Sequence, residues 1–164
     1  MKKIVIGIII GMVALALVAG ISYKVFGGGG SLGYANTGIE TVIDGATGTS
    51  TIATVFNATP YRNLVWSLAT NASASQTIKF LCSSETTKPN FVSAQSYTNV
   101  WDYCQIVDLE DGTTYDGDTG IVLTGTDDYR LFEMDTNGVR WATALITSYT
   151  AGTSTVKVRG FDNL

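Results

Sequence analysis

Ten acidic side chains lie between residues 102 and 135, and they are the first candidates for chemistry in this 164-residue chain. Calcium takes several oxygen ligands, which carboxylates on neighbouring turns can supply. An EF-hand register does not fit, because the series that would start at Asp108 reaches Gly112 and has no matching downstream Glu. Asp-Gly pairs also form ordinary turns, so calcium binding and solvated turns are the two interpretations. The candidate ligands are Asp108, Glu110, Asp111, Asp116 and Asp118.

The composition argues against catalysis. The chain contains no His, which excludes Ser-His-Asp and Cys-His mechanisms and removes the commonest metal ligand. Paired carboxylates can hydrolyse glycosides, but no feature of the sequence gives two of them distinct acid and base environments. We therefore predict that the protein is not an enzyme, that it has no catalytic residue, and that calcium is the one cofactor worth considering.

Two cysteines, Cys82 and Cys104, lie in strand-like segments without Cys-x-x-Cys spacing. In a compartment beyond a membrane, an even pair indicates a disulfide, which would join two strands or their ends. Such a bridge would stabilise the fold by about 3 kcal/mol. Buried free thiols are the alternative interpretation.

Aromatic residues are the candidates for binding by contact. Those centred in strand-like segments, such as Trp66, are expected in the core, where large aromatics bury the most surface. Tyrosines nearer to predicted loops are expected to form a contact surface for a protein or a glycan. These tyrosines are Tyr97, Tyr115 and Tyr129.

The elements that position these residues are predicted to be β-strands, because no stretch after Tyr34 has a helical period. Residues 83–99 are expected to form a long loop, and Asn137-Gly138 supplies the positive φ angles of a tight hairpin. The spacing of strands and turns predicts a mainly β fold, a single antiparallel β-sandwich of jelly-roll-like type over residues 37–164. The strands are expected at 39–43, 51–56, 64–68, 76–82, 101–107, 120–124, 129–134, 139–149 and 153–159.

The N-terminal segment predicts a location. Lys2 and Lys3 precede an apolar run from Ile4 to Tyr23, and about 20 apolar residues span a bilayer as a helix. Residues 1–26 are therefore expected to be a transmembrane anchor, and residues 27–36 a Gly-rich linker to an extracytoplasmic domain at a cell surface or virion membrane. Small residues around Ala19 leave a cleaved signal peptide as the alternative. The anchor would include Ile4, Ile10, Leu17 and Ile21.

The charge distribution restricts the partners. Three of the ten basic residues precede the linker, which leaves seven against 14 acidic residues in the rest of the chain. An acidic surface repels nucleic acid, so nucleic acid is excluded as a partner. Membrane lipid, copies of the same chain, and a receptor or glycan are the expected partners.

Four C-terminal segments, taken in their order along the chain, carry a resemblance. They are 107–112, 127–133, 137–141 and 149–158. Together they resemble the β-sandwich proteins of phage virions, over residues 40–160. The resemblance implies a small structural, decoration, spike or fibre-associated domain that is often oligomeric.

A second layout is similar to that of type IV pilins, in which one apolar N-terminal helix precedes a β-rich head. There Lys2-Lys3 would be the leader, although the usual small residue before the cleavage point is missing. We predict a non-enzymatic, membrane-anchored structural or surface protein, an assembly component of a virion or cell surface that contacts other subunits or a receptor. The alternatives are a pilin-like filament subunit and a surface-displayed carbohydrate-binding module.

Overall fold

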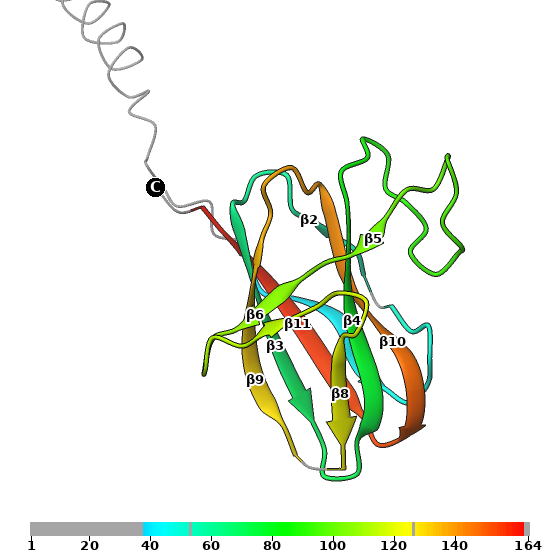
Figure 1. Cartoon of the computed structure of the whole chain (residues 1–164), viewed down its shortest axis with the longest axis vertical. Helices are drawn as coiled ribbons and strands as arrows, with labels where there is room; N and C mark the ends of the chain where they lie inside the picture. Colours follow the sequence, from blue (N-terminus) through cyan, green and yellow to red (C-terminus); the bar gives the residue numbers. More distant parts are fainter. Residues whose placement is uncertain (1–37, 53, 126, 163–164) are drawn as a thin grey trace, which may run out of the picture. The chain divides into compact units, whose positions relative to one another are not determined.

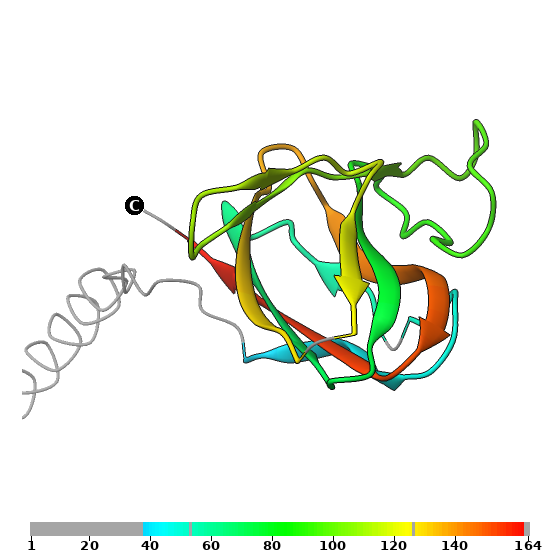
Figure 2. The same cartoon turned by 60° about the horizontal axis from the view of Figure 1, so that its bottom comes forward.

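A computed structural model describes residues 38–162 with the exception of residues 53 and 126, and this part of the chain is built from two antiparallel sheets (Figures 1 and 2). The predicted anchor and linker lie outside the described residues, as do Ile4, Ile10, Leu17 and Ile21. Within the described ranges, no helix has the length and apolarity needed to cross a membrane.

Six strands form one sheet, and their spatial order differs from their order in the chain. That order is β1 (Glu40–Ala46), β11 (Ser154–Phe161), β3 (Asn63–Thr70), β9 (Tyr129–Asp135), β6 (Ile106–Asp108) and β7 (Thr114–Tyr115). The five-stranded sheet has the order β2 (Phe56–Asn57), β10 (Trp141–Ala151), β4 (Ser75–Ser83) and β5 (Asp102–Tyr103), and β8 (Ile121–Thr124) also pairs with β4. The mainly β, antiparallel prediction is confirmed.

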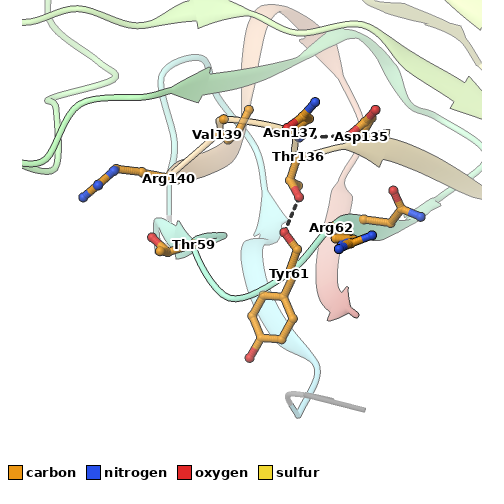
Figure 3. Close-up of a pocket in the computed structure, with 10 residues that line it drawn as sticks. Thr59, Tyr61, Arg62, Asp135, Thr136, Asn137, Val139 and Arg140 are labelled. Atoms are coloured by element: carbon orange, nitrogen blue, oxygen red, sulfur yellow. Dashed lines mark hydrogen bonds between the residues drawn. The ribbon is translucent and has the colours of Figure 1, made fainter. Parts of the chain in front are cut away.

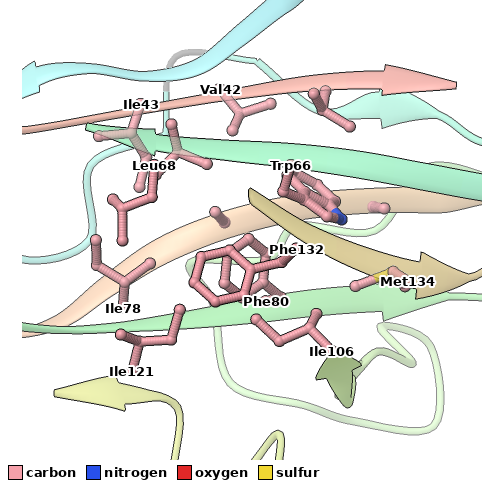
Figure 4. Close-up of a cluster of buried hydrophobic side chains, with 14 of the residues drawn as sticks. Val42, Ile43, Trp66, Leu68, Ile78, Phe80, Ile106, Ile121, Phe132 and Met134 are labelled. Atoms are coloured by element: carbon pink, nitrogen blue, oxygen red, sulfur yellow. The ribbon is translucent and has the colours of Figure 1, made fainter. Parts of the chain in front are cut away.

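The core lies between the two sheets because buried inward side chains alternate with more exposed outward ones along the strands. In β3, every second residue is buried, which places Trp66 against Phe80 of β4 with ring centroids 5.0 Å apart (Figure 4). Phe132 of β9 follows at 6.0 Å from Phe80. These large aromatic side chains are fully buried, and each buries on the order of 150–250 Å² of surface, so they dominate the apolar core.

The predicted strand at 51–56 forms only in part, as β2 at Phe56–Asn57. The preceding residues follow β10 through isolated contacts instead of a regular ladder. The Thr143 hydroxyl donates to the Thr54 carbonyl at 3.0 Å, and the Ser50 amide donates to the Ile146 carbonyl at 2.9 Å. One of these contacts comes from a side chain and the other from the backbone.

The predicted strand at 101–107 is two strands in different sheets. β5 pairs with β4 in the five-stranded sheet, whereas β6 pairs with β9 in the six-stranded sheet. The chain crosses between sheets at Cys104, whose amide donates to the Phe80 carbonyl at 2.7 Å. The short strand β7, which the sequence did not predict, then pairs with β6.

Strand directions place several loops at one end of the sandwich. β1 begins beside the end of β11, since Glu40 pairs with Val158, so Gly38 and Asp162 lie at the same end. The β4–β5 loop and the β9–β10 hairpin are also at this end, the upper one in Figure 1. The β3–β4 turn marks the opposite, lower end.

Candidate contact loop and polar pocket

Residues 84–101 leave the five-stranded sheet after β4, project beyond the sandwich and return at β5 (Figures 1 and 2). We call this segment the contact loop. A disulfide between Cys82 and Cys104 closes its base, with the two Cα atoms 5.9 Å apart, which confirms the predicted bridge. The Ser83 hydroxyl also donates to the Val100 carbonyl at 2.6 Å. The two ends of the loop are therefore fixed to each other.

Side-chain amides hold the inside of the contact loop in one conformation. Asn99 accepts a hydrogen bond from the Asn90 amide at 2.8 Å and donates to the Asn90 carbonyl at 3.0 Å and the Ala94 carbonyl at 3.1 Å. The Gln95 side chain donates to the Trp101 carbonyl at 2.6 Å. A loop ordered in this way before binding loses less conformational entropy when it meets a partner.

A small apolar cluster of its own supports the contact loop. Phe91 is buried at 2 % exposure and packs with Leu81 of β4 and Leu145 of β10, apart from the main core. Its ring lies 6.1 Å from that of Trp101. The Trp141 indole donates to the Glu85 carbonyl at 2.9 Å, which ties the start of the loop to β10. The loop is thus anchored by packing as well as by hydrogen bonds.

Beyond the exposed Glu85 and Lys88 near its start, the contact loop has an uncharged surface that is rich in contact residues. No charged residue occurs between 89 and 101, and the segment consists largely of Ser, Asn, Thr, Gln and aromatic residues. Tyr97 is 95 % exposed, with Val92 and Val100 also exposed. Antibody contact loops use the same residue types, because Tyr offers a large amphipathic surface with few rotatable bonds.

The three tyrosines that were predicted to form a contact surface do not lie on one surface. Tyr129 is exposed but begins β9 at the lower end of the sandwich, away from Tyr97. Tyr115 is half-buried, packs edge-on against Phe132 with centroids 5.9 Å apart, and accepts a hydrogen bond from Arg130. Tyr115 therefore packs at the edge of the main core rather than on an exposed loop.

Arg130 neutralises the most buried of the predicted metal ligands. Asp108 is 2 % exposed and accepts hydrogen bonds from Arg130 Nη2 at 2.7 Å and Nε at 3.0 Å. Burial by itself lowers the pKa of Arg130, but its hydrogen bonds to Tyr115 and Asp108 raise that pKa above its ordinary value. The Asp108 carboxylate is therefore engaged by a permanent cation from its own chain.

Two of the remaining predicted ligands, Asp111 and Asp116, cap their own turns. The Asp111 carboxylate accepts a hydrogen bond from the Thr113 amide at 2.8 Å, and hydrogen bonds from Thr113 lower the pKa of Asp111. Asp116 likewise accepts the Asp118 amide at 2.8 Å, while Glu110 is exposed. Among the described residues, no group of three or more His, Cys, Asp or Glu side chains is arranged to hold a metal ion. The structure does not bring the five carboxylates together.

A polar pocket of 610 Å³ opens at the upper end, between the β2–β3 connection and the β9–β10 hairpin (Figure 3). Tyr61 lies below the hairpin, and its carbonyl accepts a hydrogen bond from the Thr136 hydroxyl. The Tyr61 ring lies against Gly160, where an added Cβ would be 2.3 Å from it. The sequence predicted the hairpin but not the pocket, because the two segments meet only through the fold. The pocket is lined by Thr59, Tyr61, Arg62, Asn63, Asp135, Thr136, Asn137, Gly138, Val139 and Arg140.

Comparison with known proteins identifies a similar fold. No protein-family model matches the chain, and no curated protein matches it. The crystal structure of the SPBc2 prophage-derived protein YomS superimposes with a TM-score of 0.54 and 18 % sequence identity. The match covers 79 % of this chain and 95 % of that chain. At this level of identity the similarity establishes a shared β fold.

Proposed function

We propose that this protein is a non-enzymatic structural component of a phage-type particle or a cell surface, and that its contact loop meets the partner. The observation that carries the proposal is the loop itself, which projects, is internally ordered and exposes Tyr97 at 95 %. The fold similarity to a prophage-derived protein supports the phage-type assignment. Contact rather than catalysis is the role that such an uncharged surface favours.

The order of the strands supports the jelly-roll part of this proposal. Eight strands follow the two four-stranded sheets of a jelly roll, as β1-β11-β3-β9 and β2-β10-β4-β8. In this description the contact loop belongs to an insertion between β4 and β8, which also contains β5, β6 and β7. Jelly rolls occur in viral capsid proteins and in lectins, so the fold is compatible with both assembly and sugar binding.

Membrane anchoring is the second part of the proposal, and it rests on the apolar run from Ile4 to Tyr23. The mass of the mature protein in its native particle or envelope tests it. An unshortened chain would support a retained anchor, whereas loss of about 20 residues would show a cleaved signal peptide. Loss of the first three residues alone would favour the pilin-like filament subunit.

Photo-crosslinking from the contact loop tests its role. A photoreactive phenylalanine analogue replaces Tyr97 in the full-length chain, and the control replaces Val122, which is 60 % exposed on β8. The native particle or envelope is then irradiated. We expect a discrete crosslinked product from position 97 and none of the same mass from position 122. The same products from both positions, or none from 97, would contradict the proposal.

A second candidate function, glycan binding, is favoured by the polar pocket. Its arginine, asparagine and threonine side chains offer hydrogen bonds to hydroxyl or carboxylate groups, and Tyr61 offers an aromatic surface nearby. A glycan array probed with the full-length chain tests this function. Binding that is lost with Asn137→Ala and kept with Tyr97→Ala would assign it to the pocket. The absence of any array signal would remove this candidate.

A further inference from the structure

Exposed apolar side chains concentrate at a second place, the outer face of the six-stranded sheet. Among the described residues, Ile39, Tyr129 and Leu131 are large apolar residues exposed by 64 %, 76 % and 51 % on or beside this face. They surround the outward residues of β3, where a groove of 170 Å³ is lined partly by Ile39, Val65 and Leu131. A sheet face that serves only as a solvated surface normally alternates to polar residues, so this pattern indicates a contact surface.

Charge on this outer face is divided between the two sides of β3. On the β11 side lie Lys157 and Arg159, whose neighbours along the strand, Val156 and Val158, are buried. On the β9 side lies Glu133. Val65 of β3 pairs with Glu133 on one side and with Arg159 of β11 on the other. In the two strands that flank β3, the β11 side is therefore basic and the β9 side acidic, with small and apolar residues between them, while the exposed carboxylates Glu40 and Asp44 lie one strand further out, on β1.

We propose that a second copy of this chain covers the face, related to the first by a two-fold axis that runs along β3. This axis lays β11 of each copy over β9 of the other, so that basic residues meet acidic ones in both halves of the interface. A two-fold axis across the strands would lay β11 over β11 and bring like charges together. Charge complementarity thus selects the axis along β3.

Ser67 is placed at the centre of this interface. In β3 it lies between Lys157 of β11 and Leu131 of β9, and its small side chain allows close approach. Rotation about an axis along β3 leaves the position of each residue along the strand direction unchanged, so Ser67 faces Ser67 of the second copy. Lys157 then lies diagonally across from Glu133 of the second copy, and the pair occurs twice.

The same axis agrees with the end at which the described chain begins. Both copies keep their strand directions, so Gly38 of each copy lies at the same end of the pair. Two chains attached to one surface need this arrangement. This step rests on the proposed membrane anchoring, whereas the charge argument stands without it.

Charge reversal in the full-length, detergent-solubilised chain tests the interface by sedimentation. We expect Lys157→Glu and Glu133→Lys each to weaken dimerisation by about 10- to 30-fold, because each reversal acts twice in the dimer. The combined Lys157→Glu/Glu133→Lys variant is expected to return to within about 3-fold of the natural chain, since both pairs are restored. A combined variant no stronger than either single variant would overturn the inference.

Crosslinking supplies an independent arm of the test. Ser67→Cys with a short bismaleimide is expected to give a covalent dimer, whereas the control Val122→Cys on the other sheet is not. Equal yields from both positions would overturn the interface even if the chain is dimeric through another segment. Crosslinks from position 97 that persist in Lys157→Glu separate the two proposals, because the contact loop would then act whether or not this face pairs.

Discussion

Opening the disulfide between Cys82 and Cys104 is expected to destabilise the domain by about 3 kcal/mol. The bridge joins residues separated by 22 positions and closes the whole contact loop. The chain entropy that a crosslink of this span removes from the unfolded state is about 11 cal/mol/K, or about 3.4 kcal/mol at 25 °C. The loss therefore arises mainly in the unfolded chain and requires no change in the core.

The corresponding shift in melting temperature follows from the size of the domain. Unfolding about 125 residues carries an entropy of about 0.26 kcal/mol/K near 60 °C. Dividing the lost stability by this entropy gives a decrease of about 13 °C. Thermal unfolding followed by circular dichroism, with and without a reductant, measures the shift directly.

The control for this measurement is Cys82→Ser/Cys104→Ser. This variant should melt near the reduced natural chain and should not respond to the reductant. A decrease below about 3 °C on verified reduction would refute the reasoning, because the crosslink would then not restrict the unfolded chain as its span requires.

Amide hydrogen exchange after opening the disulfide is expected to locate the part of the structure that loosens first. Without the bridge, the base of the loop is held by the short β4–β5 pairing, at Leu81–Tyr103 and Cys82–Asp102, and by the hydrogen bond from Ser83 to Val100. Exchange at the amides of Asn90 and Asn99 is therefore expected to accelerate before exchange in β10. Equal acceleration in both places would show that the bridge supports the sandwich as a whole.

Three further substitutions probe the loop anchor, the buried ion pair and a tight turn by urea unfolding. Phe91→Ala removes the apolar anchor of the contact loop and is expected to cost about 3–5 kcal/mol. Arg130→Met leaves Asp108 buried without its cation and is expected to lower the stability of the fold by about 3–5 kcal/mol. Adding Asp108→Asn to the same chain should recover part of this loss. Gly152→Ala, at φ +84°, places a Cβ 2.3 Å from the β3–β4 turn and should cost several times the roughly 1 kcal/mol of Gly138→Ala, at φ +87° in open space.

Each of these expectations has a contradicting result. Phe91→Ala without effect would mean that the loop closes over its own cavity. Asp108→Asn that adds to the cost of Arg130→Met would mean that the carboxylate has another role. Equal costs at Gly152 and Gly138 would show that the turn moves to accept the new Cβ.

Alternation of apolar and polar residues was sufficient to predict the strands that pack on both sides of the core. Leu64, Trp66 and Leu68 are buried in β3 as their spacing requires, because a strand turns every second side chain to one face. The same pattern could not show that 101–107 changes sheets at Cys104, because strand-like residues continue through the crossing. Periodicity reports which face a residue takes, and long-range pairing decides which sheet it joins.

The candidate site was predicted less completely than the strands. Pro89 and the scattered Ser, Thr and Asn residues predict the loop at 83–99, on which Tyr97 lies exposed. The internal order of the loop depends on Asn99, whose partners are five and nine residues away, and a single Asn carries no local signal of that role. Tyr115 looked exposed beside turn residues, but Arg130 and Phe132 come from another strand to cover it.

The two contact surfaces belong to different sheets, and this separation has a functional consequence. The contact loop leaves the end of β4 in the five-stranded sheet, whereas the proposed pairing face is the outer side of the six-stranded sheet. A dimer about β3 would therefore leave both contact loops outside the interface, and the axis along the strands keeps them at the same end. A partner with repeated sites would then be met by two loops at once, and the second contact would form at a high effective concentration. Pairing through one sheet could in this way strengthen attachment through the other without any new contact in the loop itself.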